Sequence, residues 1–478
     1  MRQICLALCV VGLATFFEHD VRAEDDDGGF TIGRRPQPKN LDLATLRARV
    51  RGADLEQVVA AAEQLSQSRE PRAIVILWSL YNEGDAQRRL VAVQSIATMA
   101  QPGQEESLVK VALGEAFQAI RQVAVRGLLK TDTQPKATAR LAAAAADEKN
   151  VVPLFRFRAL QALAMIGGKD AEDVLIKYLK SPLPDLALAS AEGLGRSQSL
   201  AAIDALLSVL NTPDENLKQT VADSLGRISG ERFRYDLVKW TQWRATRAAQ
   251  PLASANLEAP YADPADIPAD APLDIVVVFD TTLSMLHVWP ELNKALDGVL
   301  SEESRTIASM RVGTVKYRAP DVDRTLSYVV QSKPLTRRLD AVREELKDAS
   351  FGGNSGALHL AVDHAIRSMN WRLDSRKLVI LIGDTSPPDE FIQPCQRMIY
   401  DAWQLDRIQI NTLYVKTSHG PEHAETYRRL AQAGVGWAYD YDKTTRKLTE
   451  INMENPALRT AELPTETAHR WLKPRKKK

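Results

Sequence analysis

The feature that most constrains the fold is a repeat in the first half of the chain. Short helical segments rich in alanine and leucine, such as LASAEGL and QTVADSL, recur every 31 to 35 residues. Each segment ends in a large aliphatic residue that has an alanine three or four positions before it, on the same helical face. These last residues are Leu65, Ile96, Leu128, Leu163, Leu194 and Leu225.

A second apolar helix follows each segment after a break. Residues 167–182 and 197–214 are examples, with Gly168, Pro182 and Pro213 marking the turns. One helix pair cannot bury its own apolar face, but six stacked pairs can. The period therefore predicts an α-solenoid over residues 41–244 and argues against a non-repetitive helical bundle.

This region resembles the short HEAT-like repeats of the phycobilisome-lyase type. Its end, SLGRISGERFRYDLVKWTQWR, resembles the closing segment of such arrays in exported bacterial proteins, in which a pair of tryptophans caps the last repeat. The resemblance implies that Trp240 and Trp243 form this pair here. We expect them to seal the end of the helical core.

The flanking and connecting segments have a different composition. Residues 245–272 contain five prolines and no sustained apolar period, which predicts a semi-extended linker. Residues 24–40 are acidic and then rich in glycine and proline, so they are interpreted as a flexible mature N-terminus. Residues 443–478 are interpreted as a solvated C-terminal tail that ends in the basic sequence HRWLKPRKKK.

Between the linker and the tail, strands and helices alternate. Continuous apolar runs such as LDIVVVFD (residues 273–280) and KLVILIGD (residues 377–384) are typical of buried parallel strands. Helical patterns separate them over about 170 residues. The alternation predicts a doubly wound, mostly parallel α/β domain over residues 273–442, so the whole chain is an α plus α/β multidomain protein.

Two of the predicted strands end in an aspartate. In open α/β sheets, ligands bind beyond the carboxyl ends of the strands. Asp280 ends one strand and is followed by Thr282 and Ser284, and Asp384 ends another. These side chains offer only oxygen atoms, which suits a hard divalent cation, Mg²⁺ first and Mn²⁺ or Ca²⁺ as alternatives.

The order of three motifs resembles the von Willebrand factor A (vWA) family. DTTLS (residues 280–284) matches the D-x-[ST]-x-S element of that family's metal-ion-dependent adhesion site (MIDAS), and LVILIGD matches the later strand that ends in an aspartate. The resemblance covers residues 273–442. It implies a Rossmann-like vWA fold in which Asp280, Thr282, Ser284 and Asp384 hold the metal, with Thr282 in place of the commoner serine.

The third motif departs from the family pattern. The family carries a threonine ligand in a Gly-rich loop, where this chain has Asn354 followed by Ser355 in FGGNSG. The resemblance implies that either the Asn354 amide oxygen or the Ser355 hydroxyl replaces that threonine, and that a neutral substitute weakens the site. Leu283 also stands where glycine is frequent. A folded site that binds no metal is the alternative.

The N-terminus has the pattern of a secretory signal. Arg2, an apolar run over residues 4–17 and VRA at 21–23 predict a signal peptide over residues 1–23 and no membrane span after its cleavage. We therefore expect an exported protein, periplasmic or secreted. Cleavage removes Cys5 and Cys9 and leaves Cys395, which is interpreted as a structural thiol.

The composition and motifs favour binding over catalysis. The net charge of +1 provides no long-range attraction to nucleic acid. His419 and His423 are four residues apart, but Gly420 and Pro421 argue against the helix of a zinc site, and no nucleophile–base pair is evident. We expect a non-enzymatic protein whose metal accepts an acidic residue from an unidentified partner protein. The alternatives are a metal-independent scaffold and a hydrolase or chelatase-type subunit.

Overall fold

The computed structural model describes residues 42–68, 70–129, 134–149, 153–197, 199–247, 271–306, 309–318, 328–353, 356–417, 420–451 and 458–462. The chain forms two compact units, residues 1–99 and 100–478. The predicted signal peptide, the predicted flexible N-terminus, and most of the predicted linker and tail lie outside the described residues.

The described part of the first unit contains four helices. They are α1 (Leu43–Val50), α2 (Leu55–Ser66), α3 (Pro71–Glu83) and α4 (Ala86–Met99). Asp42 and Asp54 precede α1 and α2, and each carboxylate accepts a hydrogen bond from a backbone N–H of the first turn. Proline begins α3, where its missing N–H costs no helical hydrogen bond.

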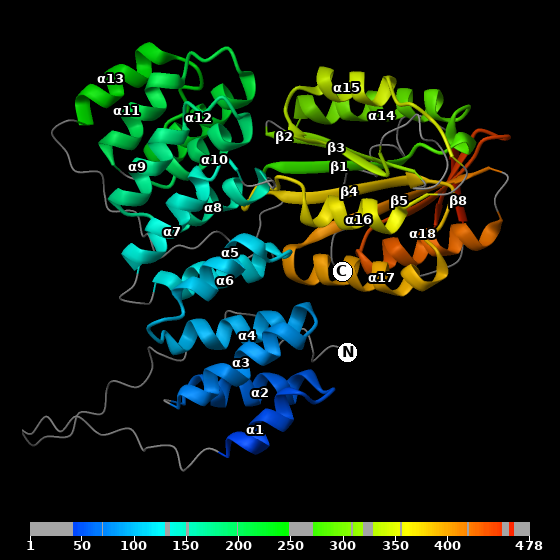
Figure 1. Cartoon of the computed structure of the whole chain (residues 1–478). Coiled ribbons are helices and arrows are strands. Elements are labelled where there is room, and N and C mark those ends of the chain that lie inside the picture. The colour runs from blue at the N-terminus through cyan, green and yellow to red at the C-terminus, as the bar shows by residue number, and fades with distance from the viewer. Residues whose placement is uncertain are drawn as a thin grey trace, which may run out of the picture. The chain divides into compact units, whose positions relative to one another are not determined.

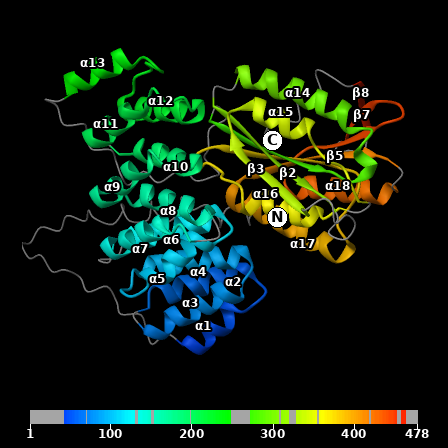
Figure 2. The same ribbon diagram turned by 45° about the horizontal axis from the view of Figure 1, so that its top comes forward.

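The helical part of the second unit has two layers. Even-numbered helices contact one another in succession, α6 with α8, α8 with α10 and α10 with α12, and odd-numbered helices do the same from α5 to α13. Figure 2 shows the resulting stack. The helices are α5 (Glu105–Gly114), α6 (Gln118–Leu129), α7 (Gln134–Ala146), α8 (Pro153–Ile166), α9 (Lys169–Tyr178), α10 (Pro184–Leu194), α11 (Leu200–Val209), α12 (Glu215–Ser229) and α13 (Leu237–Arg247).

The repeat predicted from the sequence is confirmed as a structural repeat. All six aliphatic residues of the period lie on even-numbered helices, and each is at most 1% exposed. At the end of the stack, Trp240 packs edge-on against both Phe233 and Trp243. Trp240 is fully buried, as expected of a side chain that seals the last repeat.

The rest of the second unit is an eight-stranded sheet with the order β3-β2-β1-β4-β5-β6-β7-β8. Strands β2, β1, β4, β5 and β6 are parallel, and β3, β7 and β8 are antiparallel to their neighbours. The strands are β1 (Leu273–Asp280), β2 (Met310–Tyr317), β3 (Val330–Thr336), β4 (Arg376–Gly383), β5 (Ile408–Lys416), β6 (Ala438–Asp442), β7 (Lys447–Ile451) and β8 (Leu458–Glu462).

Helices cover both faces of this sheet. Figure 1 shows α14 and α15 on one face and α16, α17 and α18 on the other. Their bounds are Trp289–Thr306 for α14, Leu339–Lys347 for α15, Leu358–Arg367 for α16, Asp389–Asp406 for α17 and Pro421–Ala433 for α18. The predicted fold class, a helical repeat region followed by a mostly parallel α/β sheet domain, is confirmed.

The end of the sheet differs from the sequence prediction. The sheet continues past Asp442, because β7 and β8 add to its edge within the predicted tail. Their short polar sequences, KLTEI and LRTAE, give little apolar signal for a strand. Among the residues that the structure describes, every helix is too short or too polar to cross a membrane.

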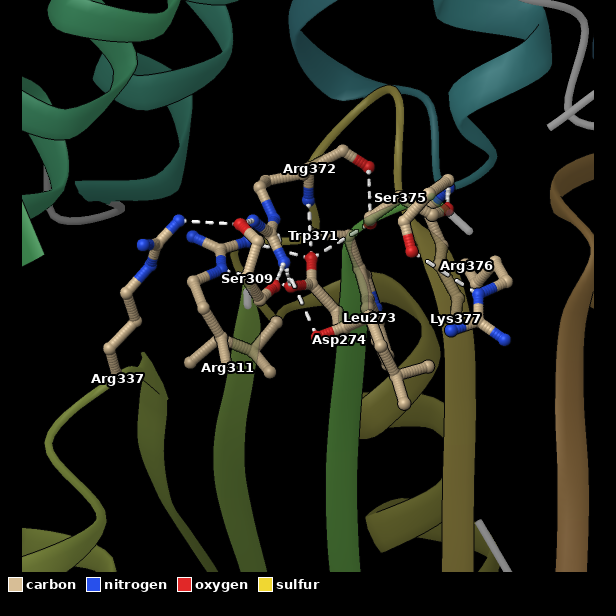
Figure 3. A network of polar contacts seen from close by, with 12 residues as sticks. Leu273, Asp274, Ser309, Arg311, Arg337, Trp371, Arg372, Ser375, Arg376 and Lys377 are labelled. Atoms are coloured by element: carbon tan, nitrogen blue, oxygen red, sulfur yellow. Dashed lines mark hydrogen bonds and ion pairs between the residues drawn. The ribbon is translucent and has the colours of Figure 1, made fainter. Parts of the chain in front are cut away.

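A buried charge cluster lies at the amino edge of the sheet. Asp274, fully buried near the start of β1, accepts two hydrogen bonds from Arg311 and three from Arg372, at 2.6–2.9 Å. The Ser375 hydroxyl donates a further bond of 2.9 Å. Figure 3 shows these groups converging on the carboxylate. Burial alone raises the pKa of Asp274, but the two guanidinium groups outweigh it and hold the pKa below its ordinary value.

The residues around this cluster also hold the repeat helices. Asn370 accepts Leu335 N–H through its Oδ1, and its amide nitrogen donates to Asp185 of α10 at 2.9 Å. Arg337 forms an ion pair with Asp223 of α12 at 3.0 Å. Helices α10 and α12 therefore pack on the amino edge of the sheet through polar contacts.

Helix α6 is attached in the same way. Its first two backbone N–H groups, of Gln118 and Ala119, donate to the two carboxylate oxygens of Asp406 at 2.8 and 2.9 Å. The end of α17 thus supplies the N-terminal cap of α6, a role that a residue next to the helix usually fills.

We expect Asp274→Asn to lower the free energy of unfolding by about 3–5 kcal/mol, because two buried guanidinium groups lose their counter-charge. The pKa of Asp274 is lower in the folded protein than its ordinary value of 3.8. The stabilisation by the Asp274 carboxylate is therefore fully present above pH 3.8 and is lost as the pH falls toward the folded pKa. Urea unfolding of the full chain at neutral pH measures the loss.

The matched control is Asp204→Asn. Asp204 also binds an arginine side chain, Arg244, through two hydrogen bonds, but its side chain is 55% exposed. Its loss costs less than about 1 kcal/mol. Equal effects of the two substitutions would contradict the importance assigned to the buried cluster.

Candidate metal centre

The two predicted aspartates meet at the carboxyl edge of the sheet. β1 and β4 are adjacent and parallel, and the strand order reverses direction between them. Asp280 is the last residue of β1, and Asp384 directly follows β4. Both are fully buried. Ligand sites in open α/β sheets lie at this kind of switch point.

The loop after β1 places the predicted hydroxyls beside Asp280. Thr282 N–H donates to Asp280 Oδ1 at 2.7 Å, which folds the loop back onto the strand end. A short 3₁₀ turn over Leu283–Met285 follows. The turn sets Thr282 Oγ1 3.0 Å from Ser284 Oγ. Asp280, Thr282 and Ser284, three of the four predicted metal-site residues whose side chains the structure describes, therefore lie at one short loop.

The Gly-rich loop lies against this turn. Gly352 N–H donates to Thr281 O at 2.8 Å, and Leu283 N–H donates to Gly353 O at 3.0 Å. Gly353 has a φ of 81°, which favours glycine. Asn354 and Ser355, predicted as alternative ligands, lie outside the described residues. On their other side, a Cβ on Gly356 would lie 3.4 Å from Asp280 Oδ2.

Hydroxyl groups hold both carboxylates of the site. Asp384 Oδ2 accepts a 2.7 Å hydrogen bond from the Thr417 hydroxyl. Asp280 Oδ2 accepts one of 3.2 Å from the Thr385 hydroxyl. Burial and the negative charge of Asp384 raise the pKa of Asp280 to about 7. A bound cation would relieve the repulsion between the two carboxylates.

Two tyrosines form the floor of the site. The hydroxyls of Tyr317, at the end of β2, and Tyr427, on α18, lie 3.2 Å apart, and Tyr427 OH donates to Thr385 O at 3.3 Å. Gly383 leaves room for them, because a Cβ there would lie 2.3 Å from Tyr427 OH and 3.1 Å from Asp280 Cβ. The floor therefore fixes the ends of β1 and β4 together.

A serine–histidine contact lies next to this floor. The Ser386 hydroxyl lies 2.8 Å from His423 Nδ1, and Ser386 N–H donates to the same nitrogen at 3.0 Å. His423 lies in the first turn of α18, which begins at Pro421 and so does not extend back to His419, a residue outside the described ones. Since the backbone N–H and the hydroxyl both approach the same nitrogen, we interpret the contact as a brace for the loop after β4.

The donor set fits a hard divalent cation. It combines two buried carboxylates with hydroxyl groups and contains no sulfur or imidazole ligand at the predicted positions. Among the described residues, no group of three or more His, Cys, Asp or Glu side chains gathers as a metal site. With two carboxylates, the candidate centre would need hydroxyl and water oxygens to complete the coordination of a cation.

Several residues of the site were not predicted from the sequence. They are Tyr317, Thr385, Thr417 and Tyr427. Tyr317 ends β2 and Thr417 directly follows β5, the strands that flank β1 and β4. The rule that pointed to Asp280 and Asp384, polar residues at the carboxyl ends of strands, would have found both. Tyr427 lies within a helix and carries no comparable signal.

Family models match part of the helical region. The model for HEAT repeats matches residues 172–250, and the model for the PBS lyase HEAT-like repeat matches residues 155–181. The predicted resemblance to these repeats is confirmed over this part of the chain. No curated protein matches the chain.

The chain also has similarity to solved structures. The pilus adhesin SpaC from Lactobacillus rhamnosus GG, in its open conformation, is 12% identical with a TM-score of 0.30, and the match covers 36% of this chain and 28% of the adhesin. Human deoxyhypusine hydroxylase in complex with glycerol is 21% identical with a TM-score of 0.19, covering 44% of this chain and 78% of the enzyme. An engineered protein is 21% identical with a TM-score of 0.22, covering 40% and 97%.

We expect Gly383→Ala to destabilise the sheet domain by about 1–3 kcal/mol, because its Cβ overlaps the two tyrosine hydroxyls. Adding Tyr317→Phe and Tyr427→Phe removes those hydroxyls and should recover part of the loss. Urea unfolding of four proteins, the unsubstituted chain, Gly383→Ala, the two tyrosine substitutions together and all three substitutions, measures the coupling between Gly383 and the tyrosines.

Gly298→Ala on α14 is the control, because a Cβ there meets nothing within 4 Å. In a helix interior this change is neutral or stabilising. If the changes in unfolding free energy caused by Gly383→Ala and by the tyrosine substitutions were simply additive, the two sites would not interact. This result would contradict a close contact between Gly383 and the tyrosine hydroxyls.

Proposed function

We propose that the protein is a non-enzymatic binding protein whose sheet domain captures a partner protein through a divalent cation, Mg²⁺ first. The observation that carries the proposal is the buried pair Asp280 and Asp384 with the hydroxyls of Thr282 and Ser284 beside it. A cation held there would offer a coordination position to an aspartate or glutamate of the partner. The protein's own residues hold and orient the metal.

The surface around the site supports a macromolecular partner. Leu283 and Leu286 in the loop after β1 are 49% and 42% exposed. Leu360 and Phe391, in the first turns of α16 and α17, are also exposed. His359 stacks on the Phe391 ring at 4.2 Å and links the two helices. We call the four apolar side chains, those of Leu283, Leu286, Leu360 and Phe391, the apolar rim. Exposed apolar groups around a polar centre are typical of protein-binding surfaces.

The two edges of the sheet have different surroundings. The amino edge carries the contacts to α6, α10 and α12 described above. The candidate centre lies at the opposite ends of the same strands, about 20 Å away along β1. Helices α6, α10 and α12 therefore contact the edge opposite the candidate centre, and the repeat helices provide a second, extended surface. We propose that this surface binds a further partner and that the protein acts after export, in the periplasm or outside the cell.

A metal-independent scaffold is the second candidate. Its supporting feature is the sequence of the third loop, in which Asn354 and Ser355 stand where a threonine is usual in vWA domains. The two candidates differ in one measurable property, the effect of a divalent cation on the folded protein. A hydrolase or chelatase-type subunit is the remaining alternative, and screening with ester, peptide and phosphate substrates tests it.

We expect MgCl₂ or MnCl₂ at millimolar concentration to raise the Tm of the full chain, because a metal that binds only the folded state stabilises it. At 100 times the Kd the gain is about 2.7 kcal/mol. Asp280→Ala should abolish the rise. Asp389→Ala, which removes an exposed carboxylate on the same edge, should retain it. No rise in the unsubstituted protein would favour the metal-independent scaffold.

We expect EDTA and Asp280→Ala each to abolish capture of the partner from an extract of the source cells, while circular dichroism shows an intact fold. Asp389→Ala captures normally and controls for the loss of a negative charge. Capture that persists after both treatments would reject the metal-dependent role.

We expect Leu286→Ser, in the apolar rim, to weaken partner capture by about tenfold or more while the metal-induced rise in Tm stays the same. An apolar contact at an interface is worth on the order of 1–3 kcal/mol. Val238→Ser is the control, because Val238 is 66% exposed but lies on α13. Loss of the metal response in Leu286→Ser would instead place this residue in the metal site.

A further inference from the structure

A second polar cavity lies at the amino edge of the sheet, away from the candidate metal centre. It is bounded by helices α5, α6 and α8 and by Leu373, which precedes β4. Its polar lining consists of Gln118, Arg121, Gln122, Arg158 and Gln161. The space among these side chains is small, on the order of one water molecule or one monatomic ion. Its size and polar lining favour a small ion or water.

The two arginines of the cavity have no carboxylate partner. Arg121 donates to Glu115 O and Ala116 O at 2.9 and 2.6 Å. Arg158, itself buried, donates to Leu113 O and Arg367 O, each at 2.8 Å. Within the described part of the chain, no ion pair joins either guanidinium to an acidic side chain. These hydrogen bonds of the two guanidinium groups go to backbone carbonyls, which carry no full negative charge.

Other charged groups lie near the cavity. Asp406 and Glu115 attract both arginines from a longer distance, and Asp406 also caps α6. The buried Lys377 is attracted by Asp406 and by two further carboxylates, so it adds no charge to the lining. Burial, followed by the charge of Arg121, lowers the pKa of Arg158 to about 8. The two arginines are therefore the charged groups that line the cavity.

The amide side chains add an unsatisfied donor. Gln118 and Gln161 donate to Leu373 O and Trp371 O at 3.0 and 3.3 Å, which uses their amide nitrogens. Gln122 is 3% exposed, and its amide nitrogen has no hydrogen-bond partner among the described residues. An unsatisfied buried donor costs about 1–3 kcal/mol, so a small acceptor in the cavity would be favoured.

We propose that this cavity binds one halide ion, chloride under natural conditions, between Arg158, Arg121 and the Gln122 amide. An acceptor-only anion satisfies the free donor and lies between two guanidinium groups that form no ion pair among the described residues. It joins α6 to α8 and so strengthens the packing of the repeat helices. The proposal is independent of the metal centre.

The test compares the Tm of the full chain in sodium chloride and in sodium methanesulfonate, whose anion is too large for the cavity, at the same ionic strength. We expect chloride to raise the Tm by about 2–4 °C, with saturation. Gln122→Met and Arg158→Met should each remove the difference, and Arg140→Met, an exposed arginine on α7, should retain it. If Arg158→Met fails to fold, Gln122→Met decides.

Crystals of the full chain grown in bromide provide the direct measurement. An anomalous peak next to Arg158 and Gln122 supports the proposal. An ordered water with no anomalous signal overturns it, as does a salt effect on Tm that is the same in the substituted and unsubstituted proteins.

Discussion

The carboxylate of Asp274, held by two arginines in the interior, is the interaction on which the rest of the structure depends. It links β1 to β2 through Arg311 and to the segment before β4 through Arg372. A buried charge is tolerated only when its partners are fixed, so these residues have one arrangement. The same segment, residues 370–375, also bonds to the repeat helices. The amino edge of the sheet is thereby joined to α10 and α12.

Both ends of β1 carry a buried aspartate, and their surroundings are opposite. Asp274 is surrounded by cations, which hold its pKa below the ordinary value, whereas Asp280 faces a second carboxylate and its pKa rises to about 7. The first aspartate is satisfied by the protein itself. The second is placed where a positive charge from outside would stabilise it, and this difference between the two ends of one strand is the physical basis of the proposed metal centre.

Much of this architecture could be predicted from the sequence because its signals are local and periodic. The positions from Leu65 to Leu225 repeat since each fills the same layer between helices. Asp280 and Asp384 were recognisable since each ends a continuous apolar strand.

Contacts between distant segments leave no such pattern. The capping of α6 by Asp406 joins residues 288 positions apart, and the cavity at Arg121 and Arg158 depends on it as much as on the repeat itself.

The cap that Asp406 provides for α6 has a consequence for the order in which the protein is made. Helix α6 leaves the ribosome with its first N–H groups unpaired, and the carboxylate that satisfies them is synthesised 288 residues later. At typical rates of translation the interval is roughly 15–60 s. During this time the repeat helices lack the surface on which they pack. The native protein is therefore completed only when its last third has been synthesised, so a chain truncated before residue 406 would present an incomplete and adhesive helical stack.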